Sequence, residues 1–123
     1  MISAYRRCRW LSIPLCAVVA QASVAADNCQ RPYVDIYKIQ GTAAQSSLVG
    51  QTIETKGVVL ATLYADSKTP QLLLQSINPD GNDATSDVIL VTDSMLAQRT
   101  QPGTVLHLRG TVREVNGLTA LTN

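Results

Sequence analysis

Four oxygen-bearing side chains lie close together in one short stretch of the chain: Asp80, Asn82, Asp83 and Asp87. Carboxylate and amide oxygens are the ligands that Ca²⁺ takes from proteins, so this stretch could form a calcium site. It lacks the ligand order and the terminal glutamate of an EF-hand loop. Asn78 and Pro79 just before this stretch and Gly81 within it are typical of turns, and this composition favours a solvated loop over a metal site.

The single histidine, His107, stands two residues before Arg109 in an alternating pattern that is typical of a β-strand. Together the two side chains could contact an anion, although the pattern favours an ordinary exposed strand position. The sequence contains neither a glycine-rich phosphate loop nor a zinc-ligand spacing, and no cysteine stands where it could pair with His107. We therefore predict no catalytic residue and, apart from the calcium hypothesis, no cofactor in this chain.

The first 26 residues have the three regions of a secretory signal peptide. Arg6, Arg7 and Arg9 form a basic start, an apolar run extends over residues 10–20, and small residues precede Asp27. The run is too short to span a bilayer as a helix, and a buried amphipathic helix is the alternative interpretation. We expect cleavage before Asp27, a secreted or periplasmic location, and no membrane association afterwards.

Cleavage changes the charge balance of the chain. Ten Lys and Arg residues less the three in the leader leave seven, against nine Asp and Glu, so the mature net charge is about −2. This balance predicts no basic patch large enough to hold a nucleic-acid backbone. Residues 27–123 suffice for one small domain.

One cysteine, Cys29, remains after Cys8 and Cys16 leave with the leader. In an oxidising compartment an odd cysteine suggests a partner in another chain, or in a part of the protein beyond this sequence. An inert thiol near the N-terminus is the alternative.

The end of the chain has the pattern of a β-hairpin. Leu106, Leu108 and Val112 alternate with polar residues, which is the period of a strand with one buried face. Asn116-Gly117 follows, a pair that tolerates the positive φ of a tight turn, so Gly117 is predicted to be structural.

Two glycines occupy matching positions in two similar stretches. Residues 50–59 repeat the spacing of residues 103–112, so that Gly57 corresponds to Gly110. Long strands that bend at a central glycine are what a small barrel requires, and we predict bends or bulges at both positions.

The remaining pattern gives the order of elements. An alternating segment covers residues 33–39, and further strands are predicted at residues 51–64, 71–75 and 88–91. Ser94 is suited to cap a short helix that ends near Arg99, before the last two strands. The predicted fold class is all-β, a small five-stranded OB-fold-like barrel with one short helix between strands three and four. A flat sandwich of few strands is the competing architecture.

An ordered set of segments resembles the N-terminal OB-like domain of bacterial extracellular endonucleases of the endonuclease/exonuclease/phosphatase superfamily. The segments are Ile36-Tyr-Lys-Ile-Gln-Gly41, Ser47-Leu-Val-Gly-Gln-Thr52, Lys56-Gly-Val-Val59, Leu73-Leu-Gln75, Asp80-Gly-Asn-Asp-Ala-Thr-Ser-Asp87, Pro102-Gly-Thr-Val105, Arg109-Gly-Thr-Val112 and Asn116-Gly-Leu-Thr119. The resemblance implies a non-catalytic accessory domain of a secreted DNA endonuclease. The metal-dependent chemistry of that family lies in a large C-terminal domain that this sequence does not contain, so a nuclease domain in cis or in trans is the implied partner. A partner for Cys29 could lie downstream.

The sequence differs from that family at positions that bear on DNA contact. Residues 71–74 are Gln-Leu-Leu-Leu where the family usually has aromatics, and Val88 stands where glycine is common. Single-strand binding by OB barrels uses stacking aromatics and a basic groove, and residues 27–123 contain three tyrosines but no Phe or Trp. We therefore expect weak or no direct DNA binding.

A second function stays open on the same pattern. The strand–glycine–strand arrangement is also similar to the short stress-associated bacterial OB proteins, which are independent periplasmic proteins. That similarity does not extend to residues 80–87 or to Ile39-Gln-Gly41. It implies a small ligand in place of a nuclease partner.

Overall fold

The computed structural model describes residues 31–64 and 68–122, which form two short helices and five strands. The predicted leader and Cys29 lie outside the described residues. In chain order the elements are α1 (Ile36–Gln40), β1 (Thr52–Tyr64), β2 (Pro70–Ser76), β3 (Val88–Val91), α2 (Ser94–Arg99), β4 (Val105–Val115) and β5 (Leu118–Thr122).

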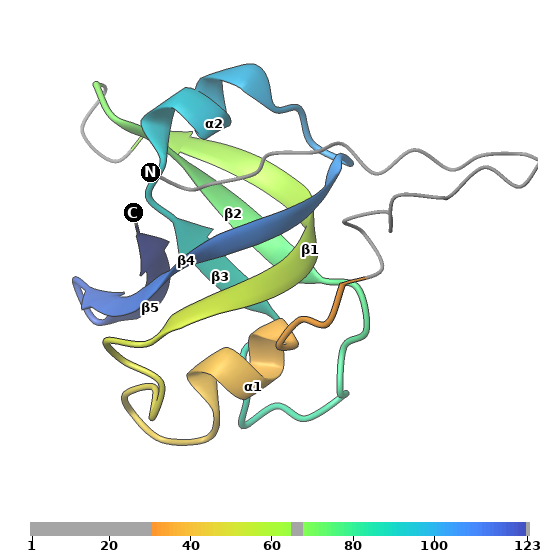
Figure 1. Ribbon diagram of the computed structural model, residues 1–123, viewed down its shortest axis with the longest axis vertical. Coiled ribbons are helices and arrows are strands. Elements are labelled where there is room, and N and C mark those ends of the chain that lie inside the picture. The colour runs from red at the N-terminus through yellow and green to blue at the C-terminus, as the bar shows by residue number, and fades with distance from the viewer. Residues whose placement is uncertain (1–30, 65–67, 123) are drawn as a thin grey trace, which may run out of the picture.

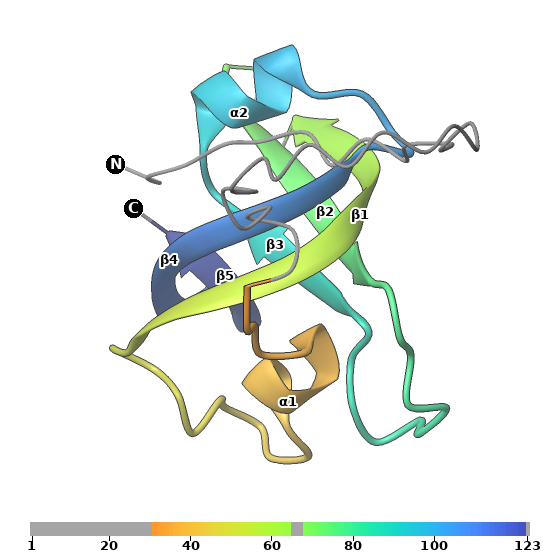
Figure 2. The same cartoon turned by 45° about the vertical axis from the view of Figure 1, so that its right-hand side comes forward.

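The strands close into a barrel in the order β1-β2-β3-β5-β4 (Figures 1 and 2). Neighbouring strands are antiparallel except β3 and β5, which run parallel. A short helix, α2, lies between β3 and β4 in the chain. The predicted fold class, an all-β five-stranded OB-fold-like barrel, is therefore confirmed, and the flat sandwich is wrong.

The core lies inside the barrel because alternate residues of each strand point inward. Fully buried inward side chains come from every strand, and one end is filled by two isoleucines of α1. The largest of these buried hydrophobic side chains are Ile36, Ile39, Leu72, Leu74, Leu106, Leu108 and Leu121.

The long strand β1 belongs to both sides of the barrel, and Gly57 lies at the changeover. It pairs with Leu106 of β4 and with Ser76 of β2. A Cβ atom at this position would lie 2.6 Å from the Gln75 carbonyl oxygen, which no side chain tolerates. The register shift of β1 occurs between Val59 and Ala61, beyond the glycine. Close backbone approach therefore explains the glycine, and the bulge lies further along the strand.

The other two predicted structural glycines have different surroundings. The pairing of β4 with β1 runs unbroken through Gly110, where a Cβ atom would lie 3.0 Å from the Thr122 carbonyl oxygen. Gly117 and the preceding Asn116 have φ values of 79° and 51°, so the β4–β5 turn uses two residues with positive φ.

The helix α2 covers one end of the barrel (Figure 1). It begins after Asp93, whose carboxylate accepts a hydrogen bond of 2.9 Å from the backbone N–H of Leu96. The predicted cap, Ser94, is instead the first helical residue. Two adjacent residues were both suited to the cap, and the aspartate occupies it. Leu96 and Ala97 are buried against the barrel.

The helix α1 replaces part of the alternating segment predicted at residues 33–39. Ile36 and Ile39 are both fully buried, and a spacing of three places them on one face of a helical turn. The Asp35 carboxylate pairs with the Lys38 ammonium at 3.1 Å, and this hydrogen bond raises the pKa of Lys38. α1 lies at the end of the barrel opposite α2 (Figures 1 and 2).

No helix within the described residues has the length and apolarity needed to cross a bilayer.

Candidate functional site

The segment that precedes α1 is fixed to the outside of β1 by backbone contacts. Val34 donates its N–H to the Glu54 carbonyl at 2.8 Å. In return the Thr55 hydroxyl donates to the Val34 carbonyl at 2.6 Å. Val34 and Thr55 also form an isolated parallel β-bridge. The segment thereby carries Tyr33 onto the outer surface where β1 and β4 pair.

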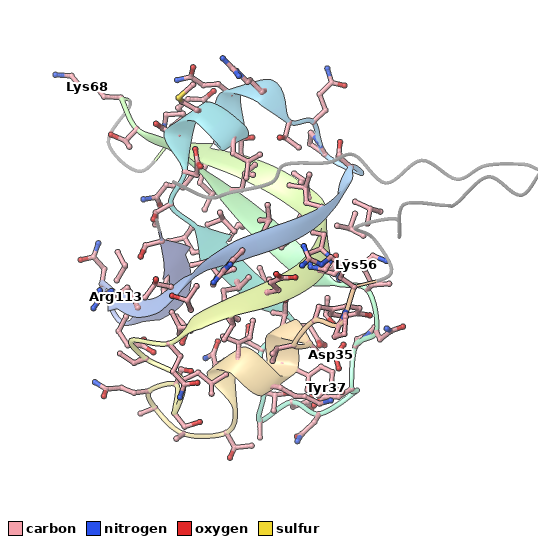
Figure 3. The ribbon with its side chains drawn as sticks, in the orientation of Figure 1. Asp35, Tyr37, Lys56, Lys68 and Arg113 are labelled. Carbon is pink, nitrogen blue, oxygen red and sulfur yellow. The ribbon has the colours of Figure 1, made fainter. Side chains whose placement is uncertain are left out.

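Four charged or titratable side chains meet on this surface, which we call the β1–β4 face. Cross-strand pairing places Glu54 opposite Arg109 and Lys56 opposite His107. Their strand neighbours are buried in the barrel, or partly buried in the case of Ile53, so alternation directs these four outward. Figure 3 shows Lys56 on the side of the barrel from which Asp35 and Tyr37 also project.

The imidazole of His107 is held between two partners. Its Nε2 lies 2.8 Å from a carboxylate oxygen of Glu54. The ring also makes an edge-to-face contact with Tyr33, with centroids 6.2 Å apart. Lys56 places its ammonium 5.8 Å from the centre of the same tyrosine ring. Tyr33 therefore packs on a histidine–glutamate pair and beside a cation.

His107 is not the exposed strand residue that the sequence predicts. Only 7% of it is accessible to solvent. The reason is non-local: the outer face of β4 is covered here by a segment more than seventy positions earlier in the chain. A carboxylate oxygen accepts hydrogen bonds, so in this pair the imidazole Nε2–H donates to Glu54. Nδ1 is buried and has no hydrogen-bond partner among the described residues. The imidazole is thus enclosed between Glu54 of β1 and Tyr33 of the N-terminal segment.

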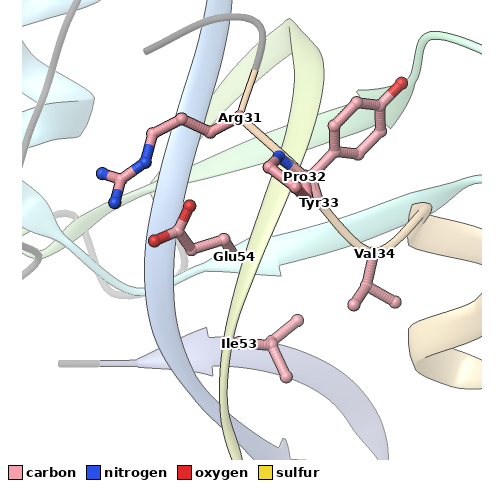
Figure 4. Close-up of a pocket in the computed structure, with 6 residues that line it drawn as sticks. All are labelled: Arg31, Pro32, Tyr33, Val34, Ile53 and Glu54. Carbon is pink, nitrogen blue, oxygen red and sulfur yellow. The ribbon is translucent and has the colours of Figure 1, made fainter. Parts of the chain in front are cut away.

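A surface pocket opens beside this cluster (Figure 4). Its volume is about 360 Å³, and it is lined by Arg31, Pro32, Tyr33, Val34, Ile53 and Glu54. Figure 4 shows the Arg31 guanidinium extending from the N-terminal segment on the same side as the Glu54 carboxylate. Opposite charges beside an apolar floor suit a small polar molecule that carries both an acidic and a basic group.

Several side chains of the acidic loop, residues 80–87, make hydrogen bonds within the loop itself. The Thr85 hydroxyl lies 3.0 and 2.9 Å from the two oxygens of Asp80 and donates its one hydrogen to that carboxylate. One of these oxygens also accepts from the Asn82 N–H. Asn82 in turn accepts from the Ala84 N–H. Within residues 31–64 and 68–122 no three His, Cys, Asp or Glu side chains converge on a point that could hold a cation. Of the three aspartates, Asp80 therefore has part of its hydrogen-bonding capacity used within the turn.

The residues that make the β1–β4 face were partly missed from the sequence. Arg109 and His107 were noted together, but Glu54, Lys56 and Tyr33 were not joined to them. The matched glycine spacing of residues 50–59 and 103–112 could have predicted this face, because two strands of similar pattern are candidates to pair with each other. The structure pairs them as β1 and β4.

No known protein family, curated protein or solved structure matches this chain.

Proposed function

We propose that this chain is a non-catalytic OB-fold-like accessory domain of a secreted DNA endonuclease, whose nuclease domain is supplied in cis or in trans. The proposal draws on the ordered segments from Ile36 to Thr119 that resemble the N-terminal OB-like domain of such enzymes. The closed barrel order agrees with that resemblance.

The observation that carries the non-catalytic part is the state of His107. Phosphodiester hydrolysis in that superfamily needs a divalent metal to stabilise charge on the phosphoryl group and a base to activate water. The one histidine of the chain is enclosed and hydrogen bonded to Glu54. The barrel therefore contributes binding or positioning, and the hydrolytic chemistry belongs to another domain.

The coding sequence around this gene tests the nuclease association directly. We expect a metal-dependent nuclease domain to be encoded either in frame after Asn123 or in a neighbouring gene with its own export signal. A region that encodes no nuclease in either position would contradict the proposal.

A second function is favoured by the pocket beside Glu54. In this alternative the chain is an independent periplasmic OB-fold protein that binds a small ligand, with Arg31 and Glu54 engaging groups of opposite charge. Thermal melts with free amino acids and dipeptides test it, because a ligand that binds the folded state raises the melting temperature. A rise in melting temperature that is lost in Glu54→Gln but kept in Glu114→Gln would support this function. A melting temperature that no amino acid or dipeptide changes would contradict it.

A further inference from the structure

We propose that the outer surface of β4 binds the sugar–phosphate backbone of DNA without sequence preference. The surface, which we call the arginine strip, consists of Arg109, Thr111 and Arg113 of β4, Thr52 of β1 and Thr122 of β5. The inference rests on the proposed DNA-associated function and deepens it by assigning the contact surface.

The strip follows from strand alternation. Leu108, Gly110 and Val112 are buried in the barrel, so Arg109, Thr111 and Arg113 face outward. Both arginines are exposed. They stand four residues apart on one strand, about 13 Å at the usual rise per residue. A flexible phosphodiester chain lying along β4 can reach both.

Hydroxyl groups fill the interval between the two arginines. Thr111 lies between Thr52 and Thr122 in the sheet. The hydroxyls of Thr52 and Thr111 are 3.2 Å apart, and Thr122 donates to the Thr111 carbonyl at 3.4 Å. Arginine and threonine side chains are typical phosphate ligands in protein–DNA complexes, and guanidinium groups bind phosphate through paired hydrogen bonds.

Two carboxylates near the strip in the sheet or in the chain, Glu54 and Glu114, accept hydrogen bonds from other groups. Glu54, opposite Arg109, accepts the hydrogen bond from His107. Glu114, next to Arg113 in the chain, accepts bonds from the Ser46 N–H and the Thr119 hydroxyl, at 3.0 and 2.9 Å. Neither Arg109 nor Arg113 forms an ion pair with a described residue. Their guanidinium N–H groups can therefore donate to an external anion.

A separate part of the chain carries negative charge without any cation. Residues 69–98 contain four aspartates and no lysine or arginine. The outward residues of β2 in this stretch are Gln71, Leu73 and Gln75, so the strand 2–3 surface that OB folds use for oligonucleotides carries no cation. A nearly neutral protein with segregated charge presents a local positive field to a polyanion. DNA is therefore expected on β4, with Arg31 adding a third cation beside Glu54 (Figure 4).

With only three cations, Arg31, Arg109 and Arg113, DNA binding is expected to be weak and to be lost as the salt concentration rises. For single-stranded DNA each neutralised phosphate contributes about −0.7 to the slope of log affinity against log salt, so the three cations predict a slope of about −2. Fluorescence anisotropy measures this, with the purified protein titrated into a fluorescein-labelled oligothymidylate between about 50 and 200 mM salt.

Two double variants with reversed charges distinguish the effect of the arginine strip on DNA affinity from the effect of the protein's net charge. Arg109→Glu with Arg113→Glu changes the net charge as much as Lys68→Glu with Arg99→Glu. Figure 3 places Lys68 near the α2 end of the barrel and Arg113 near the β4–β5 hairpin. We expect the strip pair to lower affinity at about 50 mM salt by at least about tenfold and to flatten the slope, and the control pair to lower it less than about threefold.

Equal losses in the two pairs, or no binding by the parent protein, would overturn the inference. Melting curves establish that both variants are folded, and the neutral pair Arg109→Gln with Arg113→Gln, expected to lose about threefold or more, replaces the reversal if that variant unfolds. The titration contains no nuclease, so its failure is distinct from failure of the accessory-domain proposal, which depends on the neighbouring coding sequence.

Discussion

Glu54 on β1 and His107 on β4 are hydrogen bonded at 2.8 Å although they are not directly opposite each other. The register places Arg109 opposite Glu54 and Lys56 opposite His107, so the bond is diagonal. The same imidazole is packed by Tyr33 from the segment before α1. One buried ring thus joins three parts of the chain that are distant in sequence.

This relationship predicts selective energetic coupling. In a double-mutant cycle, Glu54→Gln and His107→Ala should couple by about 0.5–1.5 kcal/mol, the net value of a hydrogen bond. The matched cycle of Glu54→Gln with Arg109→Ala should couple by less than about 0.5 kcal/mol, because that directly opposed pair forms no ion pair. Urea unfolding measures both, and a larger coupling to Arg109 would show that the diagonal bond is unimportant.

Gly57 should be the least replaceable glycine of the barrel. Gly57→Ala forces a Cβ atom against the Gln75 carbonyl, and overpacking of this kind costs about 1–3 kcal/mol. At Gly110 the nearest atom is farther, at 3.0 Å, so Gly110→Ala should cost less. The free energies of unfolding of the two variants test this order, which equal values or the reverse order would refute.

The stability effects of substituting Asp93 and Ser94 test which of the two residues caps α2. Asp93→Ala removes the acceptor for the Leu96 N–H and should cost about 1 kcal/mol of stability. Ser94→Ala changes the first helical residue and should cost less than about 0.5 kcal/mol. Thermal melts of the two variants decide between the caps, and a greater loss from Ser94→Ala would return the cap to the serine.

The strands were predictable because their signals are local. Alternation in residues 106–112, an Asn-Gly turn and the apolar run at residues 88–91 each depend on a few neighbouring side chains, and the structure has strands at these places. The position of α2 was also local, but two adjacent capping residues made its first residue ambiguous. For residues 33–39, isoleucines at positions 36 and 39 suit one helical turn as well as an extended segment, and packing at the barrel end selects the helix.

The candidate site was less predictable because it depends on distant contacts. Nothing near His107 in the sequence indicates that Tyr33 will cover it or that Glu54 will bind it. The acidic loop shows the opposite difficulty: Asp80 and Asn82 have ligand chemistry, but the same oxygens also suit turn hydrogen bonds, and the loop uses them that way. Composition alone does not separate these two uses.

Incubation with DNA should leave the substrate intact. The purified protein with Mg²⁺, Mn²⁺ or Ca²⁺ is expected to leave supercoiled plasmid unchanged on an agarose gel, because His107 is enclosed and Asp80 is engaged within its loop. A preparation of the Asp83→Ala, Asp87→Ala variant is the control. Nicking by the parent that disappears in this variant would show that the acidic loop is a metal site after all.

The most direct test of the account is to map the DNA contact residue by residue. In ¹H–¹⁵N spectra of the protein titrated with an oligothymidylate, we predict that amide shifts concentrate at Arg109, Thr111 and Arg113, with smaller shifts at Thr52 and Tyr33. The signals of β2 and of residues 80–87 should stay in place. Shifts centred on Gln71, Leu73 and Gln75 would contradict the account, because DNA would then occupy the strand 2–3 surface and leave the arginine strip without a role.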